Sequence, residues 1–209
     1  AEALKFHNAC QEAKNQLSAL AQIARAGLGG EQAEILEVQV LMLEDGEFLE
    51  EVEAAISSGA SAAEAVLRQG ETMAQEMAAL DDDYLRARAA DIRDAAGRVA
   101  GILRGTGEFA FPEGEFLLLA EDLAPSETVR LPRDRVLGLV TRQGSANSHT
   151  AILARTLNIP SLVQADMDLN DGENARILAI DASCGEWFLD PDVDTLDRLK
   201  EKQAALNRQ

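Results

Sequence analysis

The chain has 209 residues with 37 acidic and 19 basic side chains, so its formal net charge at pH 7 is -18. This length can bury a core in one large domain or two small ones, and a composition of 46% hydrophobic and 27% charged residues is typical of a folded protein. The acidity argues against contact with nucleic acid or an anionic membrane surface, because both are negatively charged. It favours a basic partner, although the same charge could serve only to keep the chain in solution.

Signals for membrane insertion, secretion and disulfide formation are absent from the sequence. No apolar run approaches the roughly 18–20 residues of a membrane span, and no signal peptide is visible. Cys10 and Cys184 lie far apart and form no disulfide framework. We therefore expect a protein of the reducing cytoplasm. Because the chain starts at Ala1 inside a helical pattern, we also expect it to be a piece of a longer protein.

The first half of the chain has the periodicity of helices. Apolar residues recur at helical spacing from Phe6 onward, and Gly29-Gly30 interrupts the pattern. Ser61 with Glu64 is the pattern of a capping box, which marks a helix start. Further helices are expected at about 31–44, continuing over 48–56 after an interruption or kink at 46, then at 61–80, and after the aspartates at 81–83. Short loops between these helices predict a bundle or paired helical hairpins.

The sequence changes in character after Gly105. Buried strands are predicted at 115–119, 135–140, 161–163, 177–180 and 186–189, with helices at 148–157 and 193–206. Strands that alternate with short helices indicate an α/β unit. The predicted fold is thus all-α over residues 1–105, as a helical bundle, and α/β over residues 106–209.

One segment is unusually acidic. Between residues 31 and 53 there are nine acidic residues and no Lys or Arg. Such a run is commonly a solvated face. Here it also contains Leu41, Met42, Leu43 and Phe48, which are more apolar side chains than one buried stripe needs. The alternative is a mixed acidic and apolar docking face for a basic partner.

The two histidines differ in their surroundings. His7 follows Phe6 in the first helix and is interpreted as structural or solvent-facing. His149 follows a strand and a loop of small residues, and a helix is expected to begin at Asn147 or Ser148. The first turn of a helix has free N–H groups that favour negative charge, and an imidazole nitrogen is a competent nucleophile toward phosphorus. From its position alone, His149 is either a phosphoryl acceptor or an ordinary histidine of a capping turn.

Other chemistries fit the sequence poorly. Ser148 and His149 are neighbours whose side chains diverge, and no Gly-x-Ser-x-Gly elbow exists, which disfavours a serine hydrolase. Two distant histidines without paired cysteines predict no metal site. Asp181 and Asp190 lie near strand ends and are interpreted as turn and capping residues.

The segment from 141 to 155 resembles the phosphohistidine signature of the phosphoenolpyruvate-utilising enzymes. The matching residues are Gly144, Ser148, His149, Ala151, Ile152, Ala154 and Arg155. Ser145 stands where the family usually has a second glycine, and Asn147 where it has threonine. Both replacements are small and polar, so we expect the function to survive them.

Further stretches narrow the resemblance. Those at 41–45, 84–94 and 119–128 are similar to enzyme I of the sugar phosphotransferase system, which is phosphoenolpyruvate-protein phosphotransferase. The likeness covers nearly the whole chain. It implies a swivelling phosphohistidine β/α domain into which a helical subdomain is inserted.

The resemblance also implies roles for residues. His149 would take a phosphoryl group from phosphoenolpyruvate and pass it to a histidine of the carrier protein HPr, with support from Thr141, Ser148 and Arg155. The carrier, which presents a basic and partly apolar face in this family, would dock on the helical subdomain. Its expected contacts are Glu37, Leu41, Met42, Glu44, Asp45 and Phe48.

Two parts of the family's enzyme are expected outside this chain. A (β/α)8 barrel that binds phosphoenolpyruvate and magnesium would follow Gln209, and an opening strand of the α/β domain would precede Ala1. The chain alone would then hold no cofactor and would not use phosphoenolpyruvate. Two alternatives stay open. One is a swivelling domain of the pyruvate phosphate dikinase or phosphoenolpyruvate synthase type, which the helical insertion disfavours. The other is a non-catalytic acidic interaction module.

Overall fold

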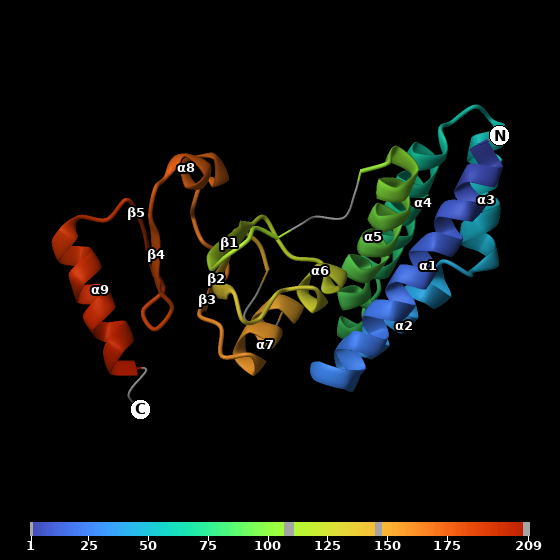
Figure 1. The fold of residues 1–209 in the computed structure, drawn as a ribbon. Helices are drawn as coiled ribbons and strands as arrows, with labels where there is room; N and C mark the ends of the chain where they lie inside the picture. The colour runs from blue at the N-terminus through green and yellow to red at the C-terminus, as the bar shows by residue number, and fades with distance from the viewer. Residues whose placement is uncertain (1, 107–110, 145–147, 207–209) are drawn as a thin grey trace. The chain divides into compact units, whose positions relative to one another are not determined.

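A computed structural model describes residues 2–106, 111–144 and 148–206 of the chain. Within these ranges, it does not describe the side chains of Asp83, Ala87, His149 and Glu173. The chain divides into two compact units (Figure 1). The helical unit combines the first part of the chain with Ala124–Arg130, and the α/β unit combines Phe111–Leu123 with the chain from Leu131 onward. The predicted fold class, an all-α part with an α/β part, is confirmed.

Apolar faces of several helices meet in the core of the helical unit. Its elements are α1 (Glu2–Gly27), α2 (Gly30–Met42), α3 (Gly46–Ser57), α4 (Ala62–Ala78), α5 (Asp83–Arg104) and the short α6 (Pro125–Val129). The largest fully buried side chains of this core include Phe6, Leu17, Leu36, Phe48, Val52, Val66 and Val99. Each such burial removes apolar surface from water and favours folding by roughly 1.5–3 kcal/mol before entropy is counted.

Helices α2 and α3 are separate, whereas the sequence suggested one pattern with an interruption or kink. Asp45 has extended backbone angles, and its Oδ1 accepts the Phe48 N–H at 2.9 Å. This is an N-cap, which satisfies a donor that the first turn would otherwise leave free. The chain therefore starts a new helix at Gly46, and the turn directs Phe48 into the core.

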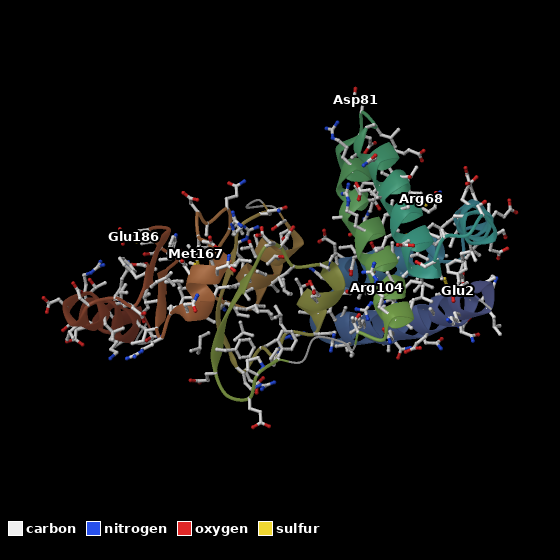
Figure 2. The ribbon with its side chains drawn as sticks, turned by 90° about the horizontal axis from the view of Figure 1, so that it is seen from above. Glu2, Arg68, Asp81, Arg104, Met167 and Glu186 are labelled. Atoms are coloured by element: carbon white, nitrogen blue, oxygen red, sulfur yellow. The ribbon has the colours of Figure 1, made fainter. Side chains whose placement is uncertain are left out.

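Helices α4 and α5 form a tightly packed hairpin (Figure 1). The capping box predicted for Ser61 and Glu64 is confirmed at the start of α4. A Cβ on Gly70 would lie only 2.4 Å from the Cβ of Ala96, so glycine is needed for the two helices to approach so closely. Asp81 lies at the turn between them (Figure 2).

The α/β unit contains a parallel sheet and a separate hairpin. The strands β1 (Phe116–Ala120), β2 (Val136–Thr141) and β3 (Ser161–Leu162) are parallel in the order β1-β2-β3, with helix α7 (His149–Thr156) between β2 and β3 in the chain. After α8 (Leu169–Asn174), β4 (Leu178–Asp181) and β5 (Glu186–Leu189) pair antiparallel, and α9 (Val193–Leu206) follows.

The described strands lie within about one residue of their predicted bounds, and α9 has its predicted bounds. Helices α6 and α8 were not predicted as separate elements. None of the helices in the described ranges is long and apolar enough to cross a membrane.

Candidate functional site

The loops that follow β1 and β2 run together at the carboxyl edge of the parallel sheet. The Arg142 N–H donates to the Ala120 carbonyl at 3.1 Å, and the Gln143 N–H donates to the Glu121 carbonyl at 2.8 Å. The Arg142 guanidinium also pairs with the Glu121 carboxylate at 2.7 Å. In open α/β sheets, ligands bind at this carboxyl edge.

Helix α7 starts at this edge with His149 as its first residue. Ser148 is the N-cap: its Oγ accepts the Ala151 N–H at 3.3 Å, and its carbonyl accepts the Ile152 N–H at 3.0 Å. The sequence placed the helix start at Asn147 or Ser148, within two residues of the observed start. The His149 side chain lies outside the described residues, but its backbone lies in the first turn, where the helix dipole favours a negative group.

The start of α7 is also tied to the loop after β1. Thr150 is 2% exposed, and its Oγ1–H donates to the Leu123 carbonyl at 3.3 Å. The residue after His149 is therefore anchored, which holds the first turn of α7 in place.

Gly144 is needed for the geometry of the loop before α7. Its φ of +93° lies in the left-handed region, which residues with a Cβ rarely adopt. A Cβ there would also lie 3.4 Å from Ser148 Oγ and 3.7 Å from Asp122 Oδ1. The backbone conformation at this position thus explains why the signature has a glycine at Gly144. The two positions that differ from the signature, Ser145 and Asn147, lie outside the described residues.

The predicted supporting residues occupy different places. Thr141 is buried at the end of β2, and its Oγ1–H donates to the Gln143 carbonyl at 2.9 Å. Ser148 caps α7 directly before His149. Arg155 is exposed in the last turn of α7. It lies six positions after His149, a rise of about 9 Å along a helix.

A second candidate site is an apolar groove on the helical unit, about 350 Å³ in volume. Residues of α2, α4 and α5 surround it, together with Asp45 from the turn between α2 and α3. The lining residues are Val38, Gln39, Leu41, Met42, Asp45, Met73, Met77, Tyr84, Leu85, Arg88, Asp91 and Ile92. We call this site the docking groove.

The structure separates the predicted apolar contacts of the docking face. Leu41 is 65% exposed beside the groove, but Met42 is only 9% exposed and Phe48 is 0% exposed. Phe48 therefore cannot present a surface to a partner, because the cap at Asp45 turns it into the core. Leu43 is buried as well, so most of the apolar residues that seemed surplus to one stripe are core.

The predicted acidic contacts are partly neutralised by α1. Glu37 pairs with Arg25 at 2.7 Å, and Glu44 pairs with Lys14 at 3.1 Å. Asp45 is exposed but serves as the cap of α3. The sequence interpretation missed the contribution of α4 and α5 to this surface. A usable signal was the pair Met73 and Met77, since residues four apart share one helix face.

Basic and aromatic groups meet at one end of the docking groove. The Arg88 guanidinium lies 4.4 Å from the centre of the Tyr84 ring and pairs with the Asp91 carboxylate at 2.9 Å. Burial lowers the pKa of Arg88, but the hydrogen bonds with Asp91 and Tyr84 outweigh this and raise the pKa above its usual value. Arg88 and Asp91 therefore form a fixed ion pair in the lining of the docking groove.

The remaining acidic candidates have structural partners. Asp181 accepts from Lys202 at 2.5 Å and from the Ser183 hydroxyl at 2.7 Å. Asp190 Oδ1 accepts the N–H groups of Arg176 and Ile177 at 2.9 Å each. Both carboxylates thus act in turns, as the sequence predicted. Within the described ranges, the one group with metal-ligand spacing is Asp181, Cys184 and Glu186, where Asp181 is already held by Lys202.

Comparisons with known proteins agree with this architecture. Residues 1–88 match the family described as PEP-utilising enzyme, N-terminal, and residues 111–185 match PEP-utilising enzyme, mobile domain. A phosphoenolpyruvate-protein phosphotransferase from Bacillus subtilis (strain 168) is 35% identical over 98% of this chain. The chain spans 36% of the length of that relative.

Solved structures give the same result. A solution structure of an enzyme I protein is 32% identical, with a TM-score of 0.77, over 99% of this chain and 84% of its own. The N-terminal domain of a nitrogen enzyme I is also 32% identical, with a TM-score of 0.65, over 97% of this chain and 84% of its own. The chain belongs to the PEP-utilising enzymes and, within them, to the enzyme I family of phosphoenolpyruvate-protein phosphotransferases.

Proposed function

We propose that this chain transfers phosphoryl groups through a phosphohistidine at His149, between phosphoenolpyruvate and the carrier protein HPr, in the service of sugar uptake. The observation that carries this proposal is the position of His149 as first residue of α7, at the carboxyl edge of the sheet. A dianionic phosphoryl group in that position is favoured by the helix dipole and by first-turn N–H groups.

Phosphoryl exchange between the two histidines forms one P–N bond and breaks another. A lone pair of a His149 imidazole nitrogen attacks phosphorus on the donor histidine of the carrier, and a new P–N bond forms. The old P–N bond breaks, and its electron pair returns to the carrier imidazole. The reaction is reversible, because both sides of the equation carry one phosphohistidine and one free imidazole.

HPr is proposed to bind the docking groove. Exposed Leu41 and the methionines of α4 supply apolar contact area, and Asp45 of the acidic segment 31–53 adds a negative charge to the lining. A basic and partly apolar carrier is complementary to such a surface, and complementary charge accelerates encounter. Thr141 and Ser148 would support the phosphorylated site, while Arg155 would act farther along α7.

Phosphoenolpyruvate and magnesium are proposed to bind another part of the longer enzyme. This chain spans about a third of its curated relative, and within the described residues the one group with metal-ligand spacing lies on the β4–β5 hairpin, not at α7. The dikinase-type alternative is disfavoured, because the likeness to enzyme I proteins runs through the helical unit as well.

Exchange with phosphorylated HPr tests the proposal and separates it from a non-catalytic interaction module. The chain is mixed with phospho-HPr, and intact mass spectrometry follows the gain of one phosphoryl group. We expect that gain without phosphoenolpyruvate or magnesium. Binding of HPr without any mass gain would leave the interaction module as the better account.

A further inference from the structure

Asp122 lies at the point where the parts of the α7 site meet. Its Oδ1 accepts the Leu123 N–H at 2.8 Å, and the Leu123 carbonyl accepts the Thr150 hydroxyl at 3.3 Å. On its other side, the Glu121 carbonyl accepts the Gln143 N–H at 2.8 Å. Asp122 is therefore fixed between the loop after β2 and the first turn of α7.

The Asp122 carboxylate lies near Ser148, the N-cap residue of α7. The Cβ position of Gly144 would lie 3.7 Å from Asp122 Oδ1 and 3.4 Å from Ser148 Oγ, so one small volume separates the Asp122 carboxylate from the residue before His149. The backbone angle of Gly144 itself, a φ of +93°, favours glycine at this position.

The Asp122 carboxylate is not neutralised by any basic side chain in the described part of the chain. Glu121 is paired with Arg142 at 2.7 Å. The arginine on α7, Arg155, is in the last turn of that helix. A single negative charge is thus held at the start of α7, where the helix itself favours anions.

We propose that Asp122 raises the phosphoryl-transfer potential of the histidine at position 149. This inference rests on the proposed function. The first-turn N–H groups of α7 stabilise a bound phosphoryl dianion, which by itself would make His149 a trap. Repulsion from Asp122 acts on the phosphorylated form and much less on the free imidazole, so it offsets that stabilisation and keeps the group transferable.

The expected size follows from the Coulomb interaction of an exposed carboxylate with a phosphoryl dianion. For a separation on the order of 10 Å, a unit charge and a dianion give an effect of about threefold to thirtyfold on an equilibrium constant, reduced by salt. Asp122→Asn should therefore hold more phosphoryl group at equilibrium. Asp122→Glu should restore the wild-type distribution in large part.

Potassium phosphoramidate provides a test that needs no carrier. The nucleophilic imidazole nitrogen forms a P–N bond, the P–N bond of the reagent breaks, and ammonia leaves. All variants are made with His7→Gln, so that one histidine remains. At fixed phosphoramidate and ammonia concentrations, intact mass spectrometry gives the phosphorylated fraction once it is constant. Asp197→Asn, an equal change of charge in the middle of α9, is the matched control.

We expect the equilibrium constant for phosphorylation to rise about threefold to thirtyfold in Asp122→Asn and to stay unchanged in Asp197→Asn, with less difference in high salt. If the two variants have equal equilibrium constants and the wild type is phosphorylated normally, the role of Asp122 is overturned but the proposed function is not. A wild-type chain that takes a phosphoryl group from neither phosphoramidate nor phospho-HPr would overturn the proposed function itself. Circular dichroism of each variant confirms that the fold is retained.

Discussion

The Asp94 carboxylate holds both the backbone and the side chain of Ser126. Its Oδ2 accepts the Ser126 N–H at 3.1 Å, and its Oδ1 accepts the Ser126 hydroxyl at 2.8 Å. Gln39 donates to Oδ2 at 3.0 Å, and Arg98 donates to the Ser126 Oγ at 2.9 Å. This network explains why α6 packs with the helical unit although the chain on either side of it belongs to the α/β unit.

The first prediction concerns this anchor. Asp94→Ala removes an ionised acceptor from a partly buried network and leaves three donors without it, so the free energy of unfolding should fall by about 1–3 kcal/mol. Chemical denaturation measures the change. Asp197→Ala on exposed α9 is the control and should change stability by less than about 0.5 kcal/mol. Equal stabilities for the two variants would show that the Asp94 network does not hold α6.

The second prediction separates surface from core among the predicted docking residues. Leu41→Ala should weaken HPr binding by about 1–2 kcal/mol, mainly through faster dissociation, and leave the fold unchanged. Leu4→Ala removes a similarly exposed leucine away from the docking groove and should leave binding unaffected. Surface plasmon resonance gives the association and dissociation rates. Comparable losses of affinity in the two variants would show that HPr binds elsewhere.

The third prediction concerns Phe48. Its side chain is fully buried, so Phe48→Ala should destabilise the helical unit by about 3–5 kcal/mol through a cavity in the core. Thermal unfolding measures this loss. A variant that kept full stability but lost HPr binding would restore Phe48 as a direct contact and contradict the structure.

The fourth prediction tests electrostatic steering by the acidic segment. Glu44→Gln with Asp45→Asn should lower the association rate with HPr and flatten its salt dependence. Asparagine also caps helices, so the start of α3 should persist. Asp194→Asn with Asp197→Asn changes the net charge equally on α9. If stopped-flow rates fall equally in both double variants, total charge and not the acidic segment governs encounter.

The fifth prediction concerns the attachment of α9 to the hairpin. The hydrogen bond from Lys202 holds the pKa of Asp181 well below its usual range, and the same bond raises the pKa of Lys202. Because the pKa of Asp181 is lowered, its charge stabilises the folded state above about pH 4, the pKa of an unfolded aspartate, and this stabilisation is lost as pH falls. Because the pKa of Lys202 is raised, its charge stabilises the folded state below about pH 10, and this stabilisation is lost as pH rises. The contribution should thus be fullest between about pH 4 and 10.

Hydrogen exchange of the α9 amides measures this contribution. Lys202→Met should speed exchange in α9 at pH 7 and leave the helical unit unchanged. Lys200→Met, two residues away, is the control. Unchanged α9 protection in Lys202→Met would show that apolar contacts alone hold the helix.

Helix positions were predictable because local signals were strong. The Ser61 and Glu64 capping box, for example, specifies the start of α4 within a few residues of sequence. The docking surface was harder, since Leu41 and Phe48 are both apolar and lie in one acidic run. Which of them faces water depends on the cap at Asp45 and on packing against distant helices. The anchoring of α6 by Asp94 joins residues 32 positions apart, and no local pattern encodes that contact.

The most direct test of the account is to locate the phosphoryl group after exchange with phospho-HPr. We expect one acid-labile, base-stable group per chain, located on His149 by tandem mass spectrometry under alkaline conditions. His149→Ala should take up none, bind HPr with unchanged affinity and melt at the wild-type temperature, whereas His7→Gln should be phosphorylated normally. Phosphoryl uptake by His149→Ala, or an acid-stable group on Ser148 or Thr150, would contradict the account.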